Sequence, residues 1–249
     1  MIASLPMYDL PALQGANDRY WQAIRARLGQ GPEKLTRGGD LWAEWQHPDL
    51  VLSQTCGYPY RARLHGKVTL VGTPDYGLPG CPPGHYRSIF VARDDDARDS
   101  LDAFRGARFA FNEPLSQSGW AAPLTHARAL GFAFEHLCET GGHLHSALAV
   151  AERRADIAAL DALTWVFLQR HHEVAGSLKE VDATMPTPVL PYICASGRDG
   201  DAVFSAIARA ITDLSTEDRQ TLHLHGILRI PPETYLAVTT PPPPGAMTG

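Results

Sequence analysis

The chain has 249 residues, of which 44% are hydrophobic and 20% charged, so it fits one large domain or two of about 100 to 150 residues. Its formal net charge is −5 and no block of Lys or Arg is present, which argues against a nucleic-acid partner or an anionic membrane surface. No stretch approaches the roughly 18 apolar residues of a membrane span, so no direct membrane insertion is expected.

Strands and helices are predicted to alternate along the chain. After an apolar run over 1–8, an amphipathic helix is predicted over 16–29, because Tyr20, Ile24 and Leu28 recur four residues apart and Gly29 ends the pattern. Apolar runs that predict strands or extended segments are 49–55, 67–74, 86–93, 108–112, 132–138, 155–161, 178–183 and 190–195. Further helices are predicted over 118–130, 145–154, 162–172 and 201–214.

This alternation predicts an α/β sandwich with mostly parallel sheets. In such sheets, ligands bind beyond the carboxyl ends of the strands, against the N-termini of helices. The segment EPLSQSG, residues 113–119, occupies this position, because it follows the predicted strand 108–112 and leads into the next helix.

Residues 116–119 allow two interpretations. The backbone N–H groups of a first helical turn lack intrahelical acceptors, so together with the hydroxyls of Ser116 and Ser118 and a close approach at Gly119 they could hold an oxyanion. Alternatively, one of the serines is an ordinary N-cap. Neither serine is followed by Glu or Gln three residues later, so the reciprocal capping box is missing.

The two ends of the chain and its cysteines bear on its location. In the segment MIASLPMYDLP, Pro6 and Asp9 interrupt the apolar stretch that a signal peptide needs. The chain as written is therefore expected in the cytoplasm, or in the periplasm if a leader has been removed. Residues 240–249 are expected to form a disordered, proline-rich tail. Cys56 and Cys81 could pair in an oxidising compartment, and reduced cysteines are the alternative.

Residues 85–200 resemble the phosphate and phosphonate binding family, the PhnD-type solute receptors of ABC importers. The resemblance is carried by YRSIFVAR, by the Ser-x-Ser-Gly turn in LDAFRGARFAFNEPLSQSGWAAP, by GGHLHSALAVAERRADIAALDALTW and by PTPVLPYICASG. It implies a type II periplasmic-binding-protein fold, with two α/β lobes, two crossover strands and a ligand cleft between the lobes. Lobe I would then be residues 1–86 plus 188–249, and lobe II residues 87–187.

The resemblance also implies a set of ligand-binding residues. The anion turn of the family carries over to residues 116–119, and the turn TCGYPY offers further contacts from lobe I. The candidate ligand-binding residues are Ser116, Gln117, Ser118, Gly119, Tyr86, Asp161, Tyr58, Tyr8 and His143. No cofactor and no metal site are expected, because the histidines in HxH and HH spacing do not converge locally.

Asp161 could select between anions. A singly protonated phosphate or phosphonate has an O–H that a carboxylate can accept, whereas sulfate at neutral pH has none and is repelled. The alternative is that Asp161 only caps the following helix. In aminoethylphosphonate receptors a Glu follows the His of this segment, whereas Leu144 follows His143 here, so an aminoalkyl phosphonate is a poor candidate ligand.

Two hypotheses about function follow. The favoured one is a monomeric, non-catalytic binding protein for a small oxyanion, phosphate or a phosphonate-like compound, with an ABC permease as partner. The alternative is a cytoplasmic enzyme on the same fold that acts on a small carboxylated metabolite, as in the futalosine route to menaquinone. The expected absence of a signal peptide favours the enzyme, whereas the Ser-x-Ser-Gly turn and the overall pattern favour the binding protein. No catalytic set of nucleophile, base and orienting group is recognisable.

Overall fold

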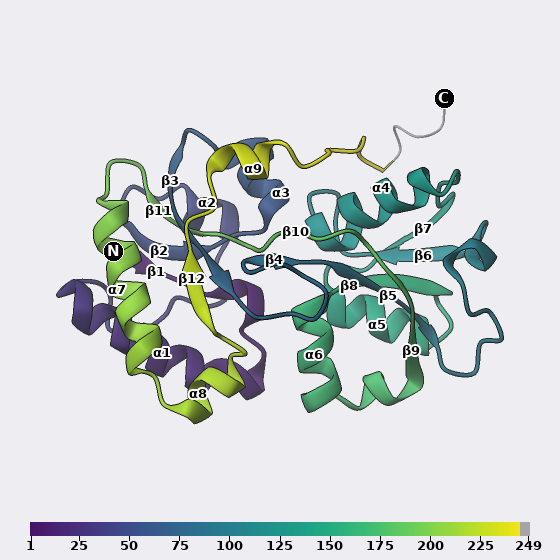
Figure 1. Ribbon diagram of the computed structural model, residues 1–249, viewed down its shortest axis with the longest axis horizontal. Coiled ribbons are helices and arrows are strands. Elements are labelled where there is room, and N and C mark those ends of the chain that lie inside the picture. The colour runs from purple at the N-terminus through teal and green to yellow at the C-terminus, as the bar shows by residue number, and fades with distance from the viewer. Residues whose placement is uncertain (245–249) are drawn as a thin grey trace. The chain divides into compact units, whose positions relative to one another are not determined.

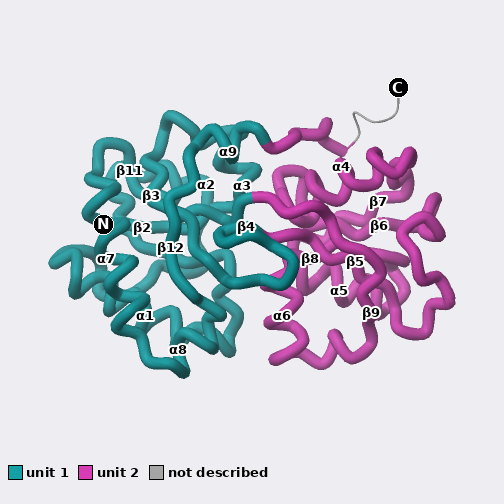
Figure 2. The backbone as a smooth tube through the Cα atoms, in the orientation of Figure 1, with its two compact units in different colours: residues 1–85, 188–237 teal, residues 86–187, 238–249 magenta. Residues whose placement is uncertain are grey.

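The computed structural model describes residues 1–244 and divides into two compact units (Figures 1 and 2). Unit 1 contains residues 1–85 and 188–237, and unit 2 contains residues 86–187 together with the segment that starts at 238. The first boundary falls after residue 85, one residue before the expected boundary after residue 86. The two connecting segments at these boundaries, β4 (His85–Tyr86) and β10 (Thr187–Pro188), pair as a two-stranded sheet.

Unit 1 is built on a five-stranded sheet with the order β1-β2-β11-β3-β12. Its strands are β1 (Ile2–Ala3), β2 (Leu50–Gln54), β3 (Val68–Asp75), β11 (Tyr192–Ala195) and β12 (Gly226–Leu228). Its helices are α1 (Gln14–Leu28), α2 (Leu41–Trp45), α3 (Gly57–Pro59), α7 (Gly200–Asp213), α8 (Thr216–Thr221) and α9 (Pro232–Leu236). Short 3-10 turns span Pro6–Tyr8 and Pro11–Leu13, and a π-helical turn spans Tyr60–Leu64.

Unit 2 is built on a second five-stranded sheet with the order β7-β6-β8-β5-β9. Its strands are β5 (Ser88–Arg93), β6 (Arg108–Phe111), β7 (His136–Glu139), β8 (Ile157–Asp161) and β9 (Leu178–Ala183). Its helices are α4 (Ala122–Ala129), α5 (His143–Ala151) and α6 (Ala162–His171). Two 3-10 turns span Leu101–Phe104 and Glu173–Ser177, and a π-helical turn spans Gln117–Ala121.

Both sheets are mixed, so the expectation of mostly parallel sheets is wrong. In unit 1 only β1 and β2 are parallel, and β11 runs antiparallel to both of its neighbours. In unit 2, β7, β6 and β8 are parallel, and β5 is antiparallel to β8 and β9. The antiparallel strands include β5 and β11, and each of these is the first strand of a five-stranded sheet that the chain forms after it passes from one unit to the other.

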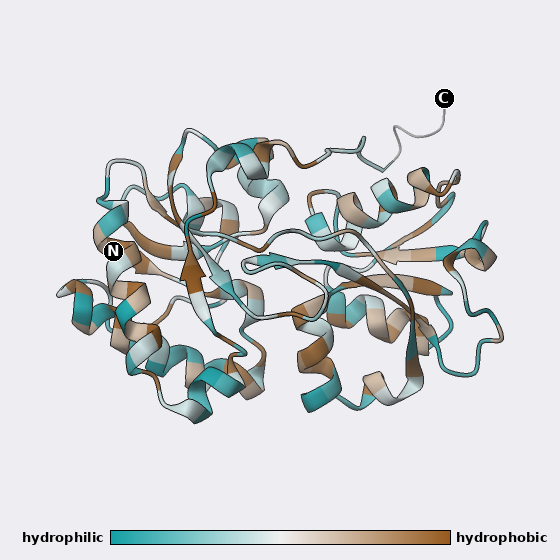
Figure 3. Cartoon of the chain, viewed as in Figure 1, coloured by the Kyte–Doolittle hydropathy of each residue, from teal (hydrophilic) through white to brown (hydrophobic). Residues whose placement is uncertain are grey.

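Each unit has its own apolar core. Helix α1 packs on α7 in unit 1, and its buried face carries Tyr20 and Ile24, whose four-residue spacing predicted this helix, together with Trp21. In unit 2, Phe109 of β6 stacks on Phe134 with ring centroids 4.3 Å apart, and Phe134 also contacts Phe90. Figure 3 shows the pattern: α1 and α7 mix hydrophilic and hydrophobic residues along their length, whereas hydrophobic residues follow the strands.

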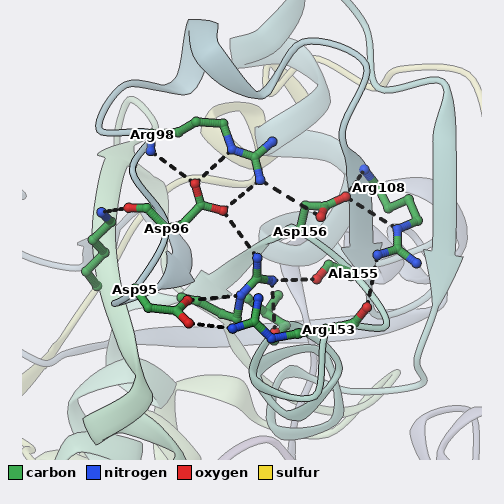
Figure 4. A network of polar contacts seen from close by, with 10 residues as sticks. Asp95, Asp96, Arg98, Arg108, Arg153, Ala155 and Asp156 are labelled. Atoms are coloured by element: carbon green, nitrogen blue, oxygen red, sulfur yellow. Dashed lines mark hydrogen bonds and ion pairs between the residues drawn. The ribbon is translucent and has the colours of Figure 1, made fainter.

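An ionic network joins the loop after β5 to the start of β6 and β8 (Figure 4). Arg98 pairs with Asp96 at 2.7 Å, and Arg108 pairs with Asp156 at 3.4 Å. The hydrogen bond from the Arg98 guanidinium holds the pKa of the Asp96 carboxyl well below its usual range. Since β6 and β8 begin here, the network lies at the amino ends of these strands, at the edge opposite their carboxyl ends.

The C-terminal segment differs from the expectation. It was expected to belong to the first lobe and to be disordered from residue 240, but residues 238–244 belong to unit 2. There the Trp120 indole N–H donates to the Pro242 carbonyl at 3.3 Å, and Pro241 is buried. The rest of the predicted tail, 245–249, lies outside the described residues.

Two further observations bear on the sequence-based expectations. None of the four cysteines, all of which lie within the described residues, is in a disulfide, so Cys56 and Cys81 are not paired with each other. No helix within residues 1–244 is both long enough and apolar enough to cross a bilayer.

Candidate functional site

The candidate anion site lies in unit 2, where three neighbouring parallel strands end at the same edge of the sheet. β6, β7 and β8 end at Phe111, Glu139 and Asp161. The segments that follow β6 and β7 are held together, because Thr140 N donates to Phe111 O at 2.9 Å and Gly141 N donates to Asn112 O at 2.8 Å. This is the edge at which sheets of this kind bind ligands.

The turn after β6 opens the helix that continues as α4. Its first turn is π-helical: Ala121 N donates to Ser116 O, five residues earlier, at 3.0 Å. The Ser116 hydroxyl oxygen accepts from Gly119 N at 2.9 Å, so Ser116 is the N-cap of this helix. The capping interpretation is therefore correct for Ser116, and the Gly119 amide is already engaged within the protein.

Ser118 makes a different contact. Its hydroxyl lies 2.8 Å from His143 Nε2, and His143 is the first residue of α5. Burial lowers the pKa of His143 to about 4, with a backbone contact at Ala159 opposing part of that shift. The imidazole is therefore neutral at physiological pH. The structure thus joins two candidate residues that lie 25 positions apart in the sequence.

Asp161 ends β8 and caps α6. Its Oδ1 accepts from Leu163 N at 2.8 Å and from Thr164 N at 3.0 Å, so the sequence-based capping interpretation is correct. The Asp161 backbone also reaches the same cluster, because its N–H donates to His143 Nδ1 at 3.4 Å. Asp161 therefore lies next to the Ser118–His143 pair through its main chain.

Gly119 is required by packing inside the turn. A Cβ at this position would lie 2.7 Å from Asn112 Cγ, closer than real Cβ contacts, and 3.0 Å from Ser116 Oγ. The Asn112 amide in turn accepts a hydrogen bond from the Ser146 hydroxyl at 3.3 Å, and Thr140 contacts Ser146 at 2.6 Å. The sequence reading did not identify Asn112, Thr140 and Ser146, although an Asn directly after an apolar strand is a usable signal.

Two of the remaining candidates, Tyr8 and Tyr58, lie in unit 1. Each follows one of the parallel strands β1 and β2, so both start from the same edge of that sheet. The Tyr8 ring packs edge-on against Tyr76 at 5.5 Å, and the Arg61 guanidinium lies 4.3 Å above the Tyr58 ring.

The structure thus groups five of the candidates in unit 2. They form two hydrogen-bonded sets, Ser116 with Gly119 and Ser118 with His143 and Asp161, and the two sets adjoin because residues 116–119 are consecutive. Gln117 begins the π-helical turn and is buried. Tyr86, which is also buried, lies in the connecting strand β4.

Together, the two mixed α/β units and the two connecting segments define a two-lobed fold of the type II periplasmic-binding-protein class. Residues 46–232 match the family described as "ABC transporter, phosphonate, periplasmic substrate-binding protein". Because this match spans more than half of the chain, the chain belongs to that family. A comparison with curated protein sequences finds no match.

Several solved structures share the fold. PhnD1 from Prochlorococcus marinus (MIT 9301), in complex with methylphosphonate, has a TM-score of 0.76 at 16% identity, with 94% of each chain covered. PA3383 from Pseudomonas aeruginosa, a binding protein component of an ABC phosphonate transporter, has a TM-score of 0.69 at 17% identity, covering 91% of this chain and 80% of its own. XAC2383 from Xanthomonas citri, bound to chloride ion, has a TM-score of 0.69 at 15% identity, covering 94% and 92%.

Proposed function

We propose that this protein is a non-catalytic binding protein for a small oxyanion of the phosphonate or phosphate class, and that the anion binds at the turn 116–119. The observation that carries the proposal is the Ser118–His143 contact beside the first turn of a helix, at the carboxyl edge of β6 and β8, in a chain of the phosphonate-binding family. Hydroxyl and first-turn amide donors suit an anion, and the helix dipole adds to their effect.

The charge of the cluster supports this class of ligand. The side chains of Ser116, Ser118 and neutral His143 carry no charge, nor does that of the neighbouring Asn112, and Asp161 supplies a carboxylate. A fully ionised anion would be repelled by that carboxylate, whereas a singly protonated phosphonate or phosphate can donate its O–H to it. We propose on this ground that the site disfavours sulfate.

The other candidate ligand residues, Gln117, Tyr8, Tyr58 and Tyr86, are part of the same proposal. The membership of the chain in a family of periplasmic ABC-transporter components supports an ABC permease as its partner and delivery of the bound anion as its role. We expect the protein to bind and deliver the anion as a monomer.

Isothermal titration calorimetry with methylphosphonate, inorganic phosphate and sulfate tests the proposal. The wild-type protein is expected to bind the first two more tightly than sulfate. The variant Asp161→Asn is the matched probe, because Asn caps helices as well as Asp does but can donate to a fully ionised oxygen. Asp161→Asn should have the melting temperature of the wild-type protein and a smaller difference in affinity between phosphate and sulfate. Equal affinities for all three anions in the wild-type protein would contradict the proposed specificity.

A further inference from the structure

The Ser118–His143 contact can be made in two ways, which differ in where the ring proton is. A neutral imidazole has one N–H donor and one acceptor nitrogen. Ser118 Oγ faces Nε2 at 2.8 Å, and the backbone N–H of Asp161 faces Nδ1 at 3.4 Å. If the proton is on Nε2, the ring donates to the serine, and if it is on Nδ1, the ring accepts from the serine.

The direction of the Asp161 N–H follows from the sheet. Ala162 N donates to Arg87 O at 3.1 Å, on the side of β8 that faces β5. Backbone groups alternate between the two sides of a strand, so the Asp161 N–H points to the opposite side, toward β6. β6 pairs with β8 only as far as Ala158, and at Asp161 the acceptor on this side is His143 Nδ1.

The backbone of Ala159 also contacts the ring, and its carbonyl points to the same side of β8 as the Asp161 N–H, because the two residues are two positions apart on the strand. A proton on Nδ1 would serve this carbonyl but would remove the acceptor that the Asp161 N–H uses. Buried N–H groups that lose their acceptor are rarer in proteins than carbonyls that lack one of their donors. The Nδ1 atom therefore accepts, and the proton is on Nε2.

We infer that His143 is a positioning residue: it donates from Nε2 to the Ser118 oxygen, so the serine's own hydroxyl proton is directed away from the ring and toward a bound anion. The inference rests on the proposed anion site. It gives the Ser118–His143 pair the opposite polarity to a nucleophilic serine, whose imidazole must accept the hydroxyl proton. His143 thus acts on the ligand through Ser118.

The tautomer can be measured on the wild-type protein without any ligand. Long-range proton–nitrogen NMR spectra of protein labelled with nitrogen-15 on histidine show which ring nitrogen of His143 carries the proton, and His143→Gln assigns the signal. We expect the proton on Nε2. A proton on Nδ1 would overturn the inference, and this result does not depend on anion binding.

A double-mutant cycle with methylphosphonate tests the route through Ser118. His143→Leu and Ser118→Ala should each weaken binding by at least about tenfold. The affinity of the double variant should lie within about twofold of that of the weaker single variant. His143→Gln, whose amide can still donate to Ser118, should recover most of the affinity. Additive losses would mean that His143 contacts the anion directly and would overturn the inference.

The two experiments separate this inference from the proposed function. If the wild-type protein binds neither methylphosphonate nor phosphate, the proposed function fails while the NMR measurement still decides the tautomer. If it binds them and the losses are additive, the proposed function stands and the positioning role fails.

Discussion

Replacing Ser116 and Ser118 separately by alanine distinguishes a helix cap from a ligand contact within one turn. The Ser116 hydroxyl accepts from Gly119 N at 2.9 Å, so Ser116→Ala removes an N-cap. Such a loss costs about 1 kcal/mol of stability, which lowers the melting temperature by about 2 to 4 °C in a protein of this size.

Ser118→Ala should act on affinity instead. The Ser118 hydroxyl contacts His143 and caps no amide of the helix, so the expected loss of stability is small. A charge-assisted hydrogen bond to an anion is worth about 1.5 to 3 kcal/mol, which corresponds to a roughly ten- to hundredfold loss of affinity.

Thermal melting and calorimetry with methylphosphonate on the same preparations measure both effects. Ser205→Ala is the matched control, because Ser205 is exposed on α7 and should change neither quantity. The reasoning is refuted if Ser118→Ala binds methylphosphonate as tightly as the wild-type protein does.

Three further predictions follow from the two units. Gly119→Ala places a Cβ 2.7 Å from the buried Asn112 and should cost about 1 to 3 kcal/mol in chemical denaturation. Because burial lowers the pKa of His143 from 6.5 to about 4, its neutral form contributes stability that is present above pH 6.5 and is lost as the pH falls toward 4, by roughly 3 kcal/mol at most. Melting temperatures should therefore fall more steeply with acid in the wild-type protein than in His143→Gln, and parallel curves would count against this. Asp96→Asn should destabilise unit 2 by about 1 to 2 kcal/mol, whereas Asp213→Asn, which breaks an exposed ion pair, should cost under about 0.5 kcal/mol in the same urea titration.

Periodicity in the sequence was sufficient to predict the main helices and strands. The four-residue spacing of Tyr20 and Ile24 predicted α1, and the run over 178–183 was predicted as a strand with the observed bounds of β9. The direction of a strand leaves no such pattern, because an apolar run looks the same whether its neighbours are parallel or antiparallel. The mixed sheets were therefore not predictable in this way.

The sequence predicted which residues to consider for the candidate site, but not the contacts that each of them makes. Ser116 and Ser118 are the same residue type and lie two positions apart. A serine at either position fits both a capping role and a ligand contact, so the sequence cannot separate the two roles. What distinguishes them is a neighbour that folding supplies: Gly119 N for Ser116, and His143 for Ser118. The contact between Asn112 and Ser146, which are 34 positions apart, was missed because a contact at that separation has no local signature.

The most direct test of the proposed site is a crystal structure of the protein grown with methylphosphonate. The proposal predicts phosphonate oxygens within about 2.7 to 3.2 Å of the Ser118 hydroxyl and of first-turn amides of the helix that begins at Gln117. It also predicts that the Asp161 carboxylate lies next to the anion. A phosphonate bound elsewhere, with the Ser118 hydroxyl contacting only His143, would contradict it.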